Sequence, residues 1–181
     1  FATIRMLSGK YRVMLMSLGR EHVSQNGEIK IETYVERLFG YAMSLCRNTH
    51  EAEDLVQDCA AKALSARRIP ADEPAYRAWL FRILKNTFLD SRRRRLTASS
   101  ALESASAEPA MEFWEGDERL INNLAVKCEL AKLPQAHSEI LTLIDVVGLS
   151  YAEAAGLLGV PAGTVMSRVS RARRALLEAL K

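Results

Sequence analysis

The chain is poor in the residues that build sheets, disulfide frameworks and membrane spans. Aromatic residues make up 7% of its 181 positions, and it has 9 glycines, 5 prolines and 3 cysteines. Because long alternating runs of β-branched residues are missing while 49% of residues are apolar, we expect an all-α protein with substantial cores. The cysteines, Cys46, Cys59 and Cys128, are odd in number and widely spaced, which indicates a reducing compartment.

The sequence also lacks the marks of secretion and of enzymatic chemistry. The apolar stretch at residues 11–18 is interrupted by Arg12 and is too short to cross a bilayer. We therefore expect a cytoplasmic protein. A glycine-rich phosphate loop, a nucleophile elbow and an inward-facing carboxylate pair are not found, so the sequence disfavours an enzyme and predicts no cofactor.

The net charge is only +3, but the charged residues are unevenly distributed along the sequence. Residues 76–95 carry seven arginines and lysines against one aspartate, whereas residues 97–119 carry six acidic residues against one arginine. Residues 150–181 are basic again. Two basic blocks that flank an acidic one are typical of a protein that binds a polyanion.

Residues 150–174, SYAEAAGLLGVPAGTVMSRVSRARR, predict two short helices joined by a tight turn. Ser150 is a good N-cap, and Glu153 three residues later completes a capping box. Gly159 can take the positive φ that ends a helix, and Pro161 suits the first turn of the next one. The pattern predicts a helix-turn-helix.

The second of these helices has two distinct faces. Its buried stripe is Val165, Val169, Ala172 and Leu176. The side chains of another face can all donate hydrogen bonds; they are Thr164, Ser167, Arg168 and Arg171. A helix-turn-helix presents the start of its second helix to base edges in the major groove in this way, although a helical hairpin with a solvated basic face has the same pattern.

The rest of the chain predicts further helices by its apolar periodicity. They span residues 31–47, 50–66, 75–95, 118–133 and 135–147. Two prolines mark residues 67–74 as a loop. We expect two small helical domains with a flexible acidic linker between them, the second being a four-helix domain. The boundaries are an N-terminal extension of unknown role at 1–30, a first domain at 31–96, a linker at 97–117 and a second domain at 118–181.

Two of these helices carry polar faces of opposite charge. The helix at 75–95 combines Tyr76 and Trp79 with a basic side that runs on into four consecutive arginines, which suits single-stranded nucleic acid as well as a solvated helix end. The helix at 50–66 has an acidic outer face near its start. Such residues stabilise the helix dipole, so residue chemistry alone favours a solvated face over a docking surface.

Three segments resemble, in the same order, bacterial sigma factors of the extracytoplasmic-function group, which keep two domains of the larger sigma factors. They are residues 52–58 (AEDLVQD), 76–94 (YRAWLFRILKNTFLDSRRR) and 133–176, within a match over 34–180. The resemblance implies that the acidic face is a docking surface for core RNA polymerase after all. The residues implied there are Glu53, Asp54, Gln57 and Asp58.

The resemblance also implies two DNA-reading surfaces, together with a regulatory anti-sigma partner. Downstream-element recognition and melting would use Arg77, Trp79, Arg82, Lys85, Asn86, Arg92, Arg93 and Arg94. Upstream-element recognition would use Thr164, Ser167, Arg168, Arg171, Arg173 and Arg174. Residues 67–75 correspond to the loop that captures a flipped base, but RRIPADEP departs from the family pattern because it has no aromatic residue.

Two alternatives belong to other classes of protein. A free-standing helix-turn-helix regulator explains residues 150–174 but gives the basic helix at 75–95 no role. A zinc or redox sensor would use Cys46, His50 and Cys59 with Cys128 or His137. Cys46 and His50 are four apart, as two ligands on one helix would be, but a loop is expected between them, and structural zinc sites normally show closely paired ligands.

Overall fold

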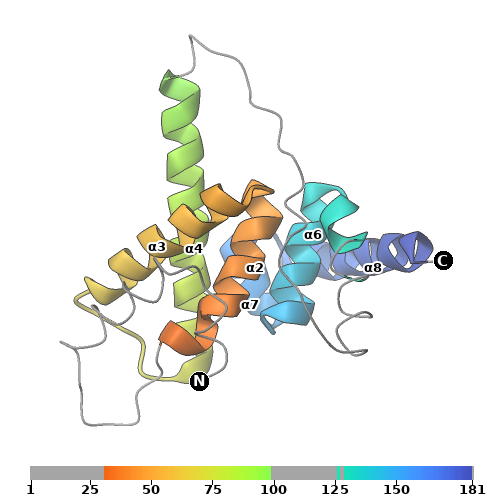
Figure 1. Cartoon of the computed structure of the whole chain (residues 1–181). Helices are drawn as coiled ribbons and strands as arrows, with labels where there is room; N and C mark the ends of the chain where they lie inside the picture. The colour runs from red at the N-terminus through yellow and green to blue at the C-terminus, as the bar shows by residue number, and fades with distance from the viewer. Residues whose placement is uncertain (1–30, 99–125, 127–128, 181) are drawn as a thin grey trace, which may run out of the picture. The chain divides into compact units, whose positions relative to one another are not determined.

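The computed structural model describes residues 31–98, 126 and 129–180, and every element in this part of the chain is helical, as predicted (Figure 1). The order is η2 (Ile31–Tyr34), α2 (Val35–Cys46), α3 (Thr49–Leu64), α4 (Glu73–Ala98), α6 (Gln135–Leu141), η3 (Thr142–Val146), α7 (Tyr151–Leu158) and α8 (Ala162–Ala179). Most of the expected linker, the extension at 1–30 and most of the helix at 118–133 lie outside the described residues. None of the helices described has the length and apolar character needed to span a membrane.

The chain divides into two compact units, Phe1–Val35 and Glu36–Lys181. In the first, Ile31 and Tyr34 of the 3₁₀ turn η2 are buried. In the second, α3 packs on α4, α6 and α7 pack on α8, and α7 also contacts α4. Helices from both expected domains therefore lie within a single compact unit.

Local capping contacts and backbone conformation place the ends of α2, α3 and α4 at residues other than the expected ones. Asn48 caps α3 by accepting a hydrogen bond from the Glu51 amide at 3.0 Å. Asp72 accepts one from the Ala75 amide at 3.0 Å, and α4 starts at Glu73, inside the expected loop. At the end of α2, Arg47 has a φ of 55°, so the helix stops one residue earlier than expected.

The core around α4 is broader than one helical stripe. Helical periodicity predicts a packed face on this helix that includes Leu80 and Leu84 but not Phe81; none of the three has any exposed surface. The Phe81 ring lies 5.8 Å from that of Tyr41 on α2, at an interplanar angle of 51°. Because α4 is covered on two sides, neighbouring positions along its sequence are buried together.

The predicted helix-turn-helix is confirmed in its local detail. The Ser150 hydroxyl accepts from the Glu153 amide at 3.2 Å, and the Glu153 carboxylate accepts from the Ser150 amide at 2.7 Å. Gly159 ends α7 with a φ of 66°. Pro161 is the N-cap of α8 rather than part of its first turn. Of the expected stripe, Val165, Val169 and Ala172 are buried.

The expected single helix at 135–147 is wrong in its last part. After α6 the backbone widens into the π-helical turn η3, in which the Val147 amide donates to the Thr142 carbonyl at 2.9 Å. The Leu149 amide then donates to the Leu143 carbonyl at 3.0 Å, across Gly148, whose φ is 79°. A π turn holds one residue more than an α turn, which sequence periodicity does not reveal.

Removal of the capping box should weaken the helix-turn-helix. We expect Ser150→Ala to lower the free energy of unfolding by about 1 kcal/mol, because the Glu153 amide loses its acceptor. Urea unfolding followed by circular dichroism measures the effect. Ser170→Ala, at an exposed position inside α8, is the matched control and should cost nothing. Equal stability of the two variants would contradict the assigned cap.

Candidate nucleic-acid and polymerase interfaces

The predicted upstream-reading face of α8 is partly open to solvent. Ser167 and Arg171 are exposed, while Thr164 and Arg168 are half-buried. The hydrogen bonds of this face are local: the Ser167 hydroxyl donates to the Thr164 carbonyl at 3.0 Å, and Arg171 Nε donates to the Ser167 carbonyl at 3.3 Å. Contacts of this kind can be exchanged for contacts to base edges without unfolding the helix.

The two remaining predicted upstream residues differ from each other. Arg174 is exposed. Arg173 makes a bidentate ion pair with Asp145 of η3, through Nη2 at 2.6 Å and Nε at 3.3 Å. The hydrogen bond and charge of Asp145 raise the pKa of the Arg173 guanidinium. This pair ties α8 to η3 and partly neutralises Arg173.

On α4, the predicted downstream-reading residues fall into two groups. The exposed ones are Arg82, Asn86, Arg92, Arg93 and Arg94. Arg93 lies 3.6 Å from Asp90 of its own helix. Trp79 is half-buried, with its ring 5.6 Å from that of Tyr76. The exposed group forms a basic surface along the helix.

Arg77 and Lys85 instead face the C-terminal helices. Lys85 Nζ makes an ion pair with Glu139 Oε1 on α6, and Arg77 Nη2 lies 3.7 Å from Glu153 Oε2 on α7. The Tyr41 hydroxyl donates to the same Glu139 oxygen at 3.1 Å. Burial, followed by the nearby charge of Glu139, raises the pKa of Tyr41 well above its usual value. Sequence reasoning missed Glu139 because its partners lie 54 and 98 positions away.

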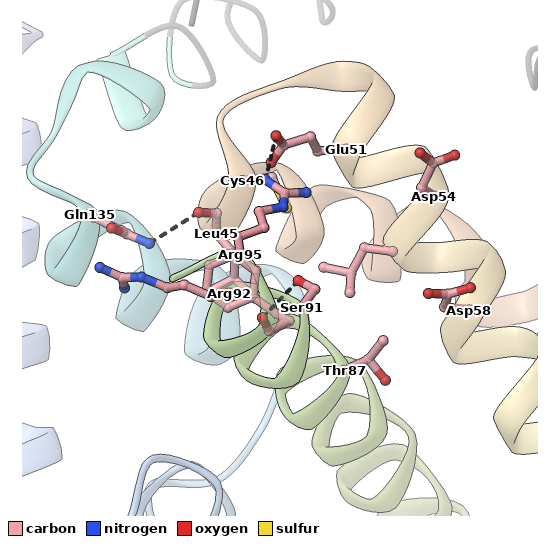
Figure 2. A pocket seen from close by; sticks show the side chains of 12 residues that line it. Leu45, Cys46, Glu51, Asp54, Asp58, Thr87, Ser91, Arg92, Arg95 and Gln135 are labelled. Atoms are coloured by element: carbon pink, nitrogen blue, oxygen red, sulfur yellow. Dashed lines mark hydrogen bonds and ion pairs between the residues drawn. The ribbon is translucent and has the colours of Figure 1, made fainter. Parts of the chain in front are cut away.

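The predicted polymerase-docking face lies along α3 (Figure 2). Asp54 and Asp58 are exposed and project from the same side of the helix, whereas Glu53 and Gln57 are half-buried. The two aspartates border a cavity of about 320 Å³ that Arg92 and Arg95 of α4 also line. Arg95 Nη1 pairs with Glu51 Oε1 at 2.6 Å beside it. Asp54 and Asp58 thus lie next to the basic residues Arg92 and Arg95. Such a surface suits a partner that presents both positive and negative side chains.

The two described cysteines, Cys59, which is buried, and Cys46, which is half-buried, have the properties of structural thiols. Burial is the main cause that raises the pKa of Cys59 to about 12 and that of Cys46 to about 11. Cys128 lies outside the described residues. Within the described ranges, no three histidine, cysteine, aspartate or glutamate side chains come together as a metal site.

These raised pKa values predict a pH-dependent stability. In the native state each thiol resists ionisation beyond its ordinary pKa of 9.0, whereas in the unfolded state it ionises normally. The contribution to stability is therefore complete below about pH 9 and is lost as pH rises toward the native pKa. We expect the free energy of unfolding to fall as pH rises from about 9 toward the native pKa values of about 11 and about 12, and to fall less steeply in Cys59→Ala. Equal slopes in urea unfolding would contradict the assignment.

Comparison with known proteins identifies the class. Residues 31–97 match the family model for Sigma-70 region 2, and residues 123–176 match that for Sigma-70 region 4. The chain is 37% identical over 145 residues to the ECF RNA polymerase sigma factor EcfG of Rhodopseudomonas palustris, covering 78% of each chain. The fold is thus that of a two-region sigma factor.

Two solved structures agree with this class. The sigma factor RpoE in complex with the anti-sigma factor NepR from Bartonella quintana is similar over 96% of this chain and 98% of its own, with 30% identity and a TM-score of 0.59. CnrH in complex with the cytosolic domain of CnrY is similar over 83% of this chain and 84% of its own, with 28% identity and a TM-score of 0.54. This chain belongs to the ECF family of RNA polymerase sigma factors, which are transcription initiation factors and not enzymes.

Proposed function

We propose that this sigma factor directs core RNA polymerase to specific promoters by reading an upstream element with α8 and by melting a downstream element with α4. The observation that carries the proposal is the partly exposed donor face at the start of α8, held by a capped helix-turn-helix. Core polymerase supplies the catalysis, and this chain supplies recognition without covalent chemistry.

Upstream recognition depends on a small number of side chains. Arg168 and Arg171 lie one turn apart on α8 and can donate to guanine or to phosphate. A bidentate arginine contact to guanine discriminates against a wrong base by about 1–3 kcal/mol. Thr164 and Ser167 lie on the same face, where their hydroxyls can reach bases or the backbone.

Downstream melting depends on α4 and on the loop before it. The exposed arginines of α4 can follow a strand's phosphates while Trp79 offers a stacking surface. In the loop, Ile69 is 54% exposed and is the apolar surface against which a flipped base can pack in place of the missing aromatic. Each unstacked step costs a few kcal/mol, which these contacts must offset.

Docking on core polymerase would use the acidic face of α3, where Asp54 and Asp58 are exposed. Regulation would come from an anti-sigma factor, since one solved relative is bound to the anti-sigma factor NepR and the other to the cytosolic domain of CnrY. Promoter DNA and core polymerase complete the set of partners that we propose.

The test is run-off transcription with purified core polymerase on a pool of genomic promoter fragments. We expect discrete transcripts that depend on this chain. A protein that binds DNA fragments but starts no transcript with core would instead be a free-standing helix-turn-helix regulator, and the proposal would fail.

A further inference from the structure

We propose that Met166 of α8 is a specificity-determining residue that contacts the 5-methyl group of a thymine in the major groove of the upstream promoter element. The inference rests on the proposed function of α8 in upstream recognition. It adds an apolar contact to a face on which the sequence predicted only hydrogen-bond donors. Its consequence is a preference for thymine that the arginines of α8 do not supply.

Met166 lies on the side of α8 that faces away from the core. Val165 and Val169 are buried, whereas the Met166 side chain is 56% exposed. Because residues four apart on an α-helix are neighbours on its surface, Ser170 lies beside Met166, and it is exposed as well. Met166 therefore projects from the open side of the helix.

The position of Met166 along α8 is that of a base-reading side chain. The helix begins at Ala162, so Met166 opens its second turn. In a helix-turn-helix, the N-terminal residues of the second helix contact base edges in the major groove. In the described part of the chain, a Cβ added to Gly163, one turn earlier, would meet no atom outside the helix within 4 Å. The surface beside Met166 is thus open to close approach by DNA.

The chemistry of methionine favours one base over the others. A thioether has no hydrogen-bond donor and is a weak acceptor, so Met166 cannot pair well with the nitrogen and oxygen atoms of base edges. The apolar group that bases present in the major groove is the 5-methyl of thymine. Because the methionine side chain is unbranched and flexible, it can adjust its reach to that methyl group. Cytosine presents an amino group and no methyl, so the contact separates the two pyrimidines.

Exposure alone does not carry this inference, since single apolar side chains are common on protein surfaces. Leu177 of the same helix is 63% exposed, but it lies near the C-terminal end of α8, away from the turns that contact bases. At Met166, exposure coincides with a base-reading position, whereas at Leu177 it does not. Leu177 is therefore the matched control for Met166.

The test uses DNA duplexes enriched for binding to the full chain together with core polymerase. Each thymine of the upstream element is replaced in turn by deoxyuridine, which removes only the 5-methyl group, and fluorescence anisotropy of the labelled duplex measures affinity. In the wild-type protein we expect replacement of one thymine to weaken binding about fourfold, which corresponds to the loss of one buried methyl contact. Met166→Ala should bind the thymine and deoxyuridine duplexes equally, whereas Met166→Leu, which keeps an apolar side chain, should retain the preference.

Leu177→Ala should keep the full preference of the wild-type protein, and circular dichroism melting checks that each variant is folded. A wild-type protein that is indifferent to every deoxyuridine replacement, or a preference that persists in Met166→Ala, would overturn the inference and leave the proposed function intact. If no sequence is enriched, upstream reading by α8 and the inference fail together. If the thymine preference is found but discrete run-off transcripts are missing, the proposed function alone fails.

Discussion

Arg168→Ala should lower promoter-specific initiation by about 10- to 100-fold while leaving binding to core polymerase unchanged, because it removes a donor from the recognition face of α8 and nothing from α3. Run-off transcription from a cognate promoter measures the first quantity, and a pull-down with core polymerase measures the second. The effect is large because few side chains on this face can discriminate between bases.

The matched control for this variant is Lys132→Ala, which removes one positive charge from an exposed position outside the helix-turn-helix. It should change run-off transcription little, because Lys132 lies outside the proposed DNA-reading faces and its loss removes no proposed contact to a base or a phosphate. Unchanged transcription in Arg168→Ala would refute the assignment of Arg168 to base reading. A comparable loss in both variants would show that Arg168 acts through charge alone.

The double variant Asp54→Ala/Asp58→Ala should weaken affinity for core polymerase by about tenfold or more. Both carboxylates are exposed on one side of α3, where a basic partner surface can reach them. Loss of two charge-assisted contacts reduces binding free energy by at least about 1.4 kcal/mol. A titration of labelled core polymerase measures the affinity.

Glu129→Ala/Glu178→Ala is the control for that variant, because it removes the same charge from the C-terminal helices. It should leave core affinity unchanged. If the α3 double variant binds core normally, the acidic face serves only to stabilise its helix, as residue chemistry alone suggested. Promoter-specific transcription at saturating core should recover in the α3 variant but not in Arg168→Ala.

Local signals in the sequence were sufficient for the helix-turn-helix. Ser150, Glu153 and Gly159 act on their own turns, so their identities alone determined where α7 begins and ends. Phe81 was missed for the opposite reason: one apolar stripe cannot show that α4 is covered on two sides. The π turn was missed because it depends on how the chain after α6 packs, which periodicity does not encode.

In the candidate interfaces too, features set by neighbouring residues could be predicted from the sequence, whereas contacts between distant residues could not. The shared face of the donors on α8 follows from helical spacing, but their exposure does not: Ser167 and Arg171 are exposed, whereas Thr164 and Arg168 are half-buried. The pairing of Lys85 with Glu139 does not follow, because an ion pair between residues 54 positions apart leaves no local pattern. Glu153 was recognised as a cap, but its proximity to Arg77 became visible only in the folded chain.

The π turn at Thr142–Val146 also shapes the connection between α6 and α7. Each residue of an α-helix advances the chain by about 100° around the axis, and a π turn absorbs one residue without that advance. Val147 and Leu149, both buried, follow the π turn, and the Leu149 amide donates to the Leu143 carbonyl across Gly148. The π turn and Gly148 thus form the short hydrogen-bonded connection through which α6 leads to Ser150, the N-cap of the helix-turn-helix that carries Arg168.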